Sequence, residues 1–386
     1  MRTMQPCVTI GSYLWAQDRV PYDEFLLRLE PLHAVMDHNN WPAVLVFGDV
    51  REHGGLAYLT NFIPRVRWAM ALLPRTGEAR LLCAMSTRDL PAMRTLTWIA
   101  DVQSGMGPEW GKQFDPWFAR FADGEAVQKL GTVGFDIMAP ALRQAVEKSL
   151  GARYSLHRAD DGLAMPSQPK RPRELTMLRA SCKLLDAAVG TMVESWRGNH
   201  APEIAALEAE RMARTRAAQD VRTLVSLDGG RTLVPFQGRF ETCDGPLVAY
   251  FAVKLAGYWA DMFVTVDDGT AQPAAMKATA ALDAAIASMR AGVRRGDVHA
   301  HAVAALAPLK LHPALSGSVG HGIGLSLHEG PEFGAAESAV LAEGGVYTLQ
   351  VGAADDKAGH ALLSAIVRCT AKGAEVLARS PAAAGG

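Results

Sequence analysis

The sequence lacks an excess of either charge and lacks any long apolar run. Its 39 Lys and Arg residues nearly balance 40 Asp and Glu residues, so that 386 residues carry a formal net charge of −1. A protein that binds nucleic acid through the phosphate backbone needs a basic excess, and we therefore expect no nucleic-acid partner. No segment reaches the roughly 18 consecutive apolar residues of a spanning helix, and polar residues interrupt the first positions. We expect no membrane association and no targeting segment.

Cysteine is scarce and scattered along the chain. There are 5 cysteines, and none forms a CxxC pair with another. An odd number without short spacings argues against both a disulfide framework and a zinc cluster. This usage fits a reducing compartment, and we predict a cytoplasmic location.

The length and one shift in composition predict two domains. A chain of 386 residues exceeds what a single hydrophobic core usually organises. Residues 165–173 hold three prolines and three basic residues, which is typical of an extended, solvated connection. We therefore predict domains over residues 1–164 and 165–380. The Ala- and Gly-rich end, residues 381–386, is expected to be a flexible tail.

The first domain is predicted to be an α/β layer built on a mixed sheet. Between residues 42 and 84, the apolar runs PAVLVFGD, LAYLTNF and WAMALLP are bounded by turn residues, as buried strands are. Residues 131–136 supply one more strand. Amphipathic spacing predicts helices over Tyr22–Asn39 and Pro140–Leu150.

The second domain is predicted to be α+β with an antiparallel sheet. Apolar residues at helical spacing alternate along the chain with β-branched and apolar runs of strand length. The expected helices cover residues 174–196, 202–218, 271–291 and 297–306. The expected strands cover residues 223–227, 246–254, 262–266, 346–351 and 362–369.

The most specific string in the chain is GHGIGLSLHEGP, residues 320–331. Three glycines around His321 allow close backbone approach, and His328 lies seven residues later, where it can return to the same cavity. An isolated histidine is more often structural, with its ring bonded to backbone groups. Two histidines in so glycine-rich a string favour a functional site.

This string is similar to the signature of the creatinase, prolidase and aminopeptidase P family, which has the pita-bread fold. Other landmarks of the family follow in order along the chain. Tyr58–Phe62 resembles the YLTGF strand of the amino-terminal domain, Gly257–Asp261 resembles the GY.SD strand, and residues 373–377 resemble the closing strand. The resemblance implies an α+β fold: a creatinase-like α/β domain, then a pita-bread domain with a curved antiparallel sheet flanked by helices.

Peptidases of this family hold two divalent ions with five ligands, in the order Asp, Asp, His, Glu and Glu. In this sequence the matching positions are Tyr250, Asp261, His321, Gln350 and Ser364. Because only one carboxylate remains where four are usual, we expect no two-metal centre and no cofactor. A single weakly held ion on Asp261, His321 and Gln350 is the alternative. Many relatives also carry a histidine in the segment that matches residues 229–236 and an arginine in the segment that matches residues 263–265. This sequence has neither.

Creatinase is a relative that resembles this chain in the loss of the metal site, since it hydrolyses a C–N bond without metal. We therefore expect a metal-independent, creatinase-like hydrolase that acts on a small polar or zwitterionic compound. His321, oriented by Asp261, is the expected general base on water, and His328 is the expected donor to the oxyanion or leaving nitrogen. Tyr250 and Gln350 would supply neutral hydrogen bonds, although both residues also fit as fillers of an abandoned metal pocket.

The run Arg65, Val66, Arg67, Trp68 follows the YLTNF segment, where the creatinase branch brings residues to a dimer partner's pocket. We expect a homodimer in which Arg65 and Arg67 bind a substrate carboxylate and Trp68 covers a cationic group. A solvated loop is the alternative for this run. Trp259, beside Asp261, is expected either as a substrate wall or as a core residue.

Three other functions stay open at this point. The chain could be a non-catalytic pita-bread binding protein, a repurposed lyase, or a metal-dependent Xaa-Pro peptidase-like enzyme. The partner that we expect besides a second copy is a small-molecule substrate.

Overall fold

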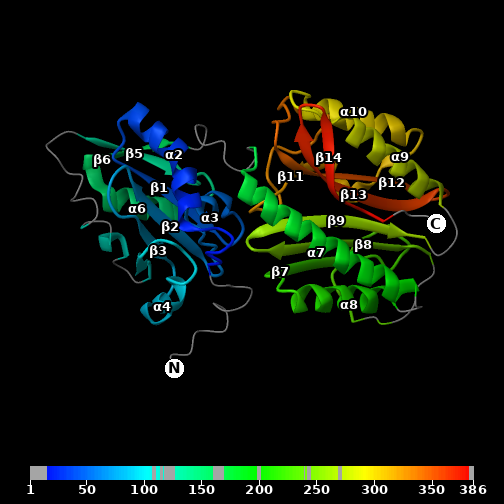
Figure 1. The fold of residues 1–386 in the computed structure, drawn as a ribbon, viewed down its shortest axis with the longest axis horizontal. Coiled ribbons are helices and arrows are strands. Elements are labelled where there is room, and N and C mark those ends of the chain that lie inside the picture. The colour runs from blue at the N-terminus through cyan, green and yellow to red at the C-terminus, as the bar shows by residue number, and fades with distance from the viewer. Residues whose placement is uncertain are drawn as a thin grey trace. The chain divides into compact units, whose positions relative to one another are not determined.

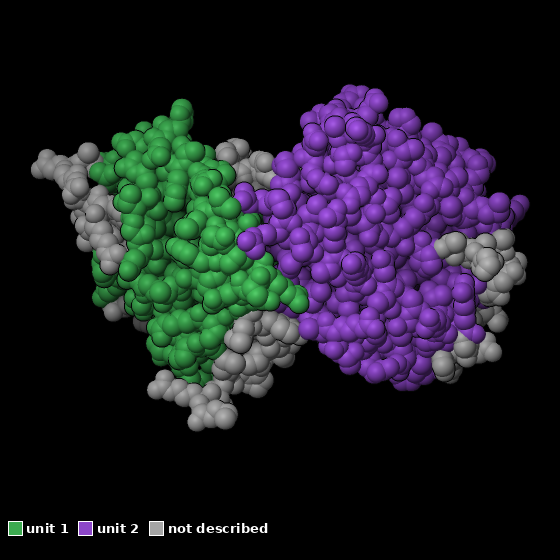
Figure 2. All heavy atoms as spheres, viewed as in Figure 1, with its two compact units in different colours: residues 1–165 green, residues 166–386 purple. Residues whose placement is uncertain are grey.

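The computed structural model describes residues 15–106, 110–113, 116, 127–159, 169–197, 201–238, 240, 245–267 and 272–381. The chain divides into two compact units, residues 1–165 and 166–386, which Figure 2 colours green and purple. Among the described helices, none is both long enough and apolar enough to cross a membrane.

The first unit is built on a mixed sheet of six strands in the order β4-β3-β2-β1-β5-β6 (Figure 1). Strand β1 pairs antiparallel with β2 and parallel with β5, as a mixed sheet requires. The strands are β1 (Ala43–Asp49), β2 (Trp68–Pro74), β3 (Arg80–Cys83), β4 (Asp101–Ser104), β5 (Gln128–Val133) and β6 (Tyr154–Arg158). Among the described residues, the α-helices of this unit are α2 (Tyr22–Asn39), α3 (Gly54–Thr60), α4 (Leu90–Met93) and α6 (Pro140–Leu150).

Strand β1 explains why helices cover both faces of this sheet. Successive side chains of a strand point to opposite faces, and here nearly all of them are buried. Val44 and Val46 belong to a core with α2 and α3, whereas Leu45 and Phe47 belong to a second core with α6. A strand buried on both sides reads as the continuous apolar run that the sequence has at this point.

The predicted strand over LAYLTNF, which includes Tyr58–Phe62, was wrong, because these residues form α3 and its carboxyl end. Leu56 and Leu59 are buried on one side, three residues apart, which is helical spacing. The helix ends at Asn61, whose backbone is left-handed with φ of 62°. Short apolar runs do not distinguish a buried strand from a buried helix, and here packing against β1 decides the structure.

The second unit contains the predicted helices and strands with boundaries shifted by a few residues. Its helices are α7 (Pro172–Arg197), α8 (Pro202–Thr215), α9 (Pro273–Ser288) and α10 (Arg295–Leu306). Its strands are β7 (Asp220–Val225), β8 (Leu247–Leu255), β9 (Tyr258–Val266), β10 (Lys310–Leu311), β11 (Gly320–Gly322), β12 (Val346–Asp355), β13 (Gly359–Thr370) and β14 (Gly373–Arg379).

The strands of this unit form two antiparallel sheets, one of β7, β8 and β9 and one of β10 to β14. Hydroxyl groups join the sheets where β9 passes β13: Phe263 N donates to Ser364 Oγ at 2.9 Å, and Thr265 Oγ1 donates to Leu362 O at 2.9 Å. Helices α7 and α8 pack on the first sheet, and α9 packs on β12 and β13 of the second (Figure 1). The two sheets are therefore joined between β9 and β13 by these hydrogen bonds, and each sheet has helices packed on it.

Candidate active site

The centre of the candidate site is the carboxylate of Asp261, which has no exposed surface. Thr348 Oγ1 donates to Asp261 Oδ1 at 2.7 Å, and Gln350 Nε2 donates to Oδ2 at 2.9 Å. Tyr250 also donates its hydroxyl to Oδ2, at 3.2 Å. Removing a carboxylate from water is unfavourable unless it is hydrogen-bonded, and these three donors offset the lost hydration.

Strand pairing explains why these side chains meet. In the β8–β9 hairpin, Ala252 lies opposite Asp261 and Tyr250 lies opposite Phe263, so that Tyr250 and Asp261 share one face of the sheet. On β12, Thr348 and Gln350 are two positions apart and therefore share a face. One hairpin register thus brings Tyr250 and Asp261 together, although they are eleven residues apart in the sequence.

His321 approaches Asp261 from β11, where it lies opposite Thr348 in the β11–β12 pairing. Its Nδ1 lies 2.8 Å from the carbonyl oxygen of Gly322, and because a carbonyl only accepts, Nδ1 carries the hydrogen. The other nitrogen, Nε2, is 3.6 Å from Asp261 Oδ2 and has no hydrogen-bond partner among the described residues. Nε2 is therefore the basic atom of this imidazole.

His328 returns to His321, as the glycine-rich string predicts. The two rings stack with centroids 3.7 Å apart and planes inclined by 19°. The His321 side chain is 2% exposed whereas that of His328 is 56% exposed, so that His328 forms the solvent side of the stack. His328 Nδ1 also lies 3.9 Å from Glu332 Oε1.

The two histidines have pKa values that move in opposite directions. Burial opposes the charged form of His321, but the Asp261 carboxylate outweighs burial and raises the pKa of His321 above its ordinary value. Burial and the neighbouring His321 lower the pKa of His328. Burial would raise the pKa of Asp261, but the neighbouring His321 ring, which can carry a positive charge, together with the Thr348 hydroxyl outweighs burial and lowers that pKa. His321 is thus the ring that accepts a proton more readily, and His328 is the ring that stays neutral.

A buried ion pair holds the loop that carries His328. Lys170 Nζ lies 2.7 Å from Glu329 Oε2, and both side chains are almost fully buried. A Cβ at Gly324 would lie 2.6 Å from Glu329 Oε1 and 2.7 Å from Lys170 Nζ, which explains the glycine at this position. The expectation that residues 165–173 are solvated was therefore wrong at Lys170, because the buried Glu329 needs a cation beside it.

A second buried cation supports the same loop further along. Arg295 donates from Nη1 to the carbonyl oxygen of Pro331. Its guanidinium lies between the rings of Phe333 and Tyr347, at 5.3 and 5.0 Å from their centroids. No local sequence pattern predicts this contact, because Arg295 is far along the chain from both Phe333 and Tyr347.

The remaining predicted residues of the second unit are placed differently. Ser364 lies opposite Gln350 in the β12–β13 register, but its hydroxyl accepts from Phe263 N rather than contacting Asp261. Trp259 is 3% exposed and lies beneath two cations, with Arg222 Cζ at 4.8 Å and Lys254 Nζ at 5.4 Å from its ring centroid. Trp259 is therefore buried, and the exposed Arg222 lies over its ring.

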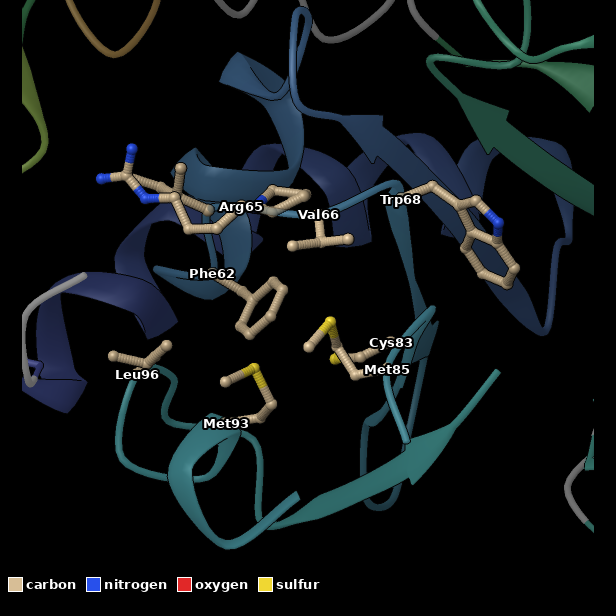
Figure 3. A pocket seen from close by; sticks show the side chains of 10 residues that line it. Phe62, Arg65, Val66, Trp68, Cys83, Met85, Met93 and Leu96 are labelled. Atoms are coloured by element: carbon tan, nitrogen blue, oxygen red, sulfur yellow. The ribbon is translucent and has the colours of Figure 1, made fainter. Parts of the chain in front are cut away.

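Most of the run Arg65–Trp68 lies around a small pocket near the start of β2, whereas Arg67 does not line it (Figure 3). Arg65, Val66 and Trp68 are among its lining residues, with Phe62 and the methionines Met85 and Met93 between them. Trp68 stands at one end of this view, and its ring centroid is 6.4 Å from that of Phe47. Arg67 is exposed and donates to Met106 Sδ at 3.3 Å. Their approach to a partner's pocket stays a prediction.

The donor set around Asp261 does not fit the two-metal centre that the resemblance implies. Among the residues described, no group of three or more His, Cys, Asp or Glu side chains could hold a metal ion. The two oxygens of Asp261 already accept hydrogen bonds from a hydroxyl, an amide and a phenol. Removing three carboxylates leaves too little negative charge for two dications.

A family model described as metallopeptidase family M24 matches residues 176–371, which is more than half of the chain. The chain belongs to metallopeptidase family M24. The solved structures to which this M24 protein is similar confirm the predicted fold, in which an amino-terminal α/β domain precedes a pita-bread domain. The prolidase from Pyrococcus horikoshii has a TM-score of 0.73 at 17% identity, covering 92% of this chain and 99% of that one.

Two further structures and one curated relative complete the comparison. The X-Pro aminopeptidase from Thermotoga maritima has a TM-score of 0.76 at 17% identity and covers 92% of this chain and 98% of that one. The amino-terminal domain of the FACT complex subunit SPT16 from Cicer arietinum has a TM-score of 0.65 at 16% identity, with 92% and 96% covered. The putative dipeptidase YkvY of Bacillus subtilis is 28% identical over 221 residues, which is 55% of this chain and 61% of YkvY. The match thus spans less than two thirds of that relative.

Proposed function

We propose that this M24 protein is a metal-independent hydrolase that cleaves a C–N bond in a small polar or zwitterionic compound. The observation that carries the proposal is the buried Asp261–His321 contact beneath the exposed His328, at the positions where the family resemblance places metal ligands. Membership of a family of peptidases supports hydrolysis of a C–N bond as the reaction class.

In the proposed reaction, His321 Nε2 accepts a proton from a water molecule as the water oxygen attacks the carbon of the C–N bond. The resulting imidazolium is stabilised by Asp261, whose carboxylate is fixed by Tyr250 and Gln350. The proton then passes from His321 to the leaving nitrogen, so that the hydroxyl group stays on carbon. The neutral ring of His328 donates a hydrogen bond to the oxygen that gains charge.

A non-catalytic binding protein is the second candidate. The likeness to an SPT16 domain favours it, because that structure is named as a subunit of a complex rather than as an enzyme. In this alternative, the Asp261 cluster is a filled pocket and the exposed His328 belongs to a recognition surface.

The test is turnover by purified protein after exhaustive treatment with a chelator, measured as release of amine from a panel of small amides, amidines and Xaa-Pro dipeptides. We expect turnover that survives the chelator and disappears in the variant His321→Ala. Turnover that requires added Mn²⁺ or Co²⁺ would instead identify a metal-dependent dipeptidase, in line with the names of the prolidase and YkvY relatives. Binding of panel compounds without any turnover would favour the binding protein.

A further inference from the structure

Arg222 lies on the same face of the three-stranded sheet as Asp261. In the register of β7, β8 and β9, Arg222 is opposite Ala252, and Ala252 is opposite Asp261. Directly opposite residues project to the same side of a sheet, and neighbouring strands are about 4.8 Å apart. The Arg222 and Asp261 backbones are therefore about 10 Å apart across the sheet, with Ala252 on the strand between them.

The opposite face of this sheet is closed by helices. Ser181 on α7 donates to the carbonyl oxygen of Tyr258, and Thr223 on β7 donates to Glu210 on α8 at 2.6 Å. Thr223 is the neighbour of Arg222 and points the other way. Arg222 itself is exposed, so that it belongs to the polar face of the unit rather than to the helix-covered face.

The guanidinium of Arg222 is held in place without being neutralised. Its Cζ lies 4.8 Å from the ring centroid of the buried Trp259, which is a cation–π contact. Among the described residues, no carboxylate forms an ion pair with Arg222. The guanidinium thus lies over a buried ring, which positions it without forming an ion pair.

Arg222 also acts on the candidate site through its charge. Burial, followed by the Asp261 carboxylate, raises the pKa of Tyr250, and the charge of Arg222 counteracts this rise. The strand register places Tyr250 on the same face as Arg222, on the neighbouring strand and two residues before Ala252. The distance of Arg222 across the sheet from Asp261 is the length of a short amino-acid derivative.

We propose that Arg222 binds a carboxylate of the substrate, so that the compound cleaved at His321 is a small carboxylate-bearing amide. This inference rests on the proposed function and names its substrate class. A guanidinium offers parallel N–H donors that match the two oxygens of a carboxylate. A monoanion suits this position better than a phosphate, because Arg222 supplies one positive charge and Asp261 places a negative charge on the same face.

The experiment measures binding of a matched pair of probes, N-acetylglycine and N-acetylglycinamide, by isothermal titration calorimetry. The two compounds differ in the carboxylate and share the amide. We expect wild-type protein to bind N-acetylglycine about 10-fold or more tightly than N-acetylglycinamide, and the variant Arg222→Gln to lose this preference. Arg222→Lys should keep an intermediate preference, since lysine retains the positive charge but lacks the parallel N–H donors of the guanidinium.

Arg290→Gln is the matched control, because Arg290 is another exposed arginine of the same unit with no ion pair among the described residues. It should keep the full preference. The assignment is wrong if N-acetylglycine does not bind, if Arg222→Gln keeps the preference, or if methyl phosphate binds more tightly than N-acetylglycine.

The two proposals fail separately. A carboxylate preference that disappears in Arg222→Gln, without cleavage of any amide in the panel, would overturn the hydrolase and leave the role of Arg222 in binding. Cleavage of amides with equal preference for charged and neutral probes would overturn the role of Arg222 and leave the hydrolase.

Discussion

His321 and His328 form a stacked pair, with centroids 3.7 Å apart, in which one ring is buried against a carboxylate and the other faces solvent. A charge on either ring disfavours a charge on its neighbour. Because Asp261 stabilises the proton on His321, the pair holds its proton on the buried ring. This asymmetry gives the two histidines different functions in the proposed reaction.

The pH dependence of turnover should report the Asp261–His321 contact. A general base must be unprotonated, and the pKa of His321 is raised above 6.5. We therefore expect kcat/KM to increase with pH, with a midpoint above 6.5. In Asp261→Asn the carboxylate is lost and burial dominates, so that the midpoint should move below 6.5.

The matched control for this profile is Thr348→Val, which removes one hydrogen bond to Asp261 and keeps its charge. Its midpoint should stay above 6.5, the ordinary value for His321. A profile with the same midpoint in wild type and Asp261→Asn would mean that His321 does not control the rate.

Loss of the buried cation beside Glu329 should destabilise the second unit. Lys170→Met leaves a buried carboxylate without its partner, and we expect the free energy of unfolding to decrease by about 3–5 kcal/mol. The double change Lys170→Met with Glu329→Gln should recover part of this loss, because no charge is then buried. Urea unfolding of the single and double variants measures both effects.

The surface pair Arg179–Glu375 provides the comparison, since its side chains are 47% and 37% exposed. Arg179→Met should change the free energy of unfolding by less than about 1 kcal/mol. Equal losses for Lys170→Met and Arg179→Met would contradict the structural role of the buried pair.

Local sequence patterns predicted the site where one hairpin or one motif sets the geometry. His321 and His328 share a glycine-rich string, so that their spacing along the chain predicted their contact. Tyr250 and Asp261 share a hairpin, and the family resemblance implied that they lie together. Lys170 and Glu329 are 159 residues apart, and no local pattern links them. A basic residue among prolines is usually solvated, and only tertiary packing buries this one.

Arg222 was missed for a different reason. The expected strand over residues 223–227 begins three residues too late and leaves Arg222 out, whereas β7 covers Asp220–Val225. Strand boundaries are weakly encoded because flanking polar residues fit a strand end and a turn equally well. With the boundary misplaced, the alternation that places Arg222 on the face of Asp261 could not be predicted.

Metal content tests the proposal that the centre has lost its ions. We expect purified protein to contain less than about one tightly bound divalent ion per chain, because one carboxylate, one imidazole and neutral groups make a weak donor set. Elemental analysis after dialysis measures it. Two stoichiometric ions would contradict the proposal and point to a metallopeptidase.

Restoring the implied ligands should restore metal binding. The triple change Tyr250→Asp, Gln350→Glu and Ser364→Glu adds three carboxylates beside Asp261. Without metal these charges repel one another, so that added Mn²⁺ should raise the Tm of the triple variant and leave wild type unchanged. The single change Gln350→Glu is the control and should respond weakly. A wild-type Tm that rises with Mn²⁺ would oppose the proposal.

A homodimer is expected, with the Arg65–Trp68 run of one chain near the partner's pocket. Sedimentation at micromolar concentration should give a dimer. The double change Arg65→Gln and Arg67→Gln should raise KM with little change in kcat, because these residues are expected to bind substrate rather than to transfer protons. A monomer in sedimentation would rule out this arrangement.

Substitution of His321 should separate the enzyme from the binding protein. His321→Ala removes the buried base and should lower kcat by about 10²- to 10⁴-fold with little change in KM, since a positioned general base contributes an effect of this size. His328→Ala should have a smaller effect, because its neutral ring donates a hydrogen bond and does not accept the proton. Single-turnover rates and ligand binding, measured on the same preparations, distinguish these effects. If wild type binds a ligand tightly without forming product, and His321→Ala binds it with the same affinity, then His321 has no catalytic role and recognition by the pocket or its surface is the function.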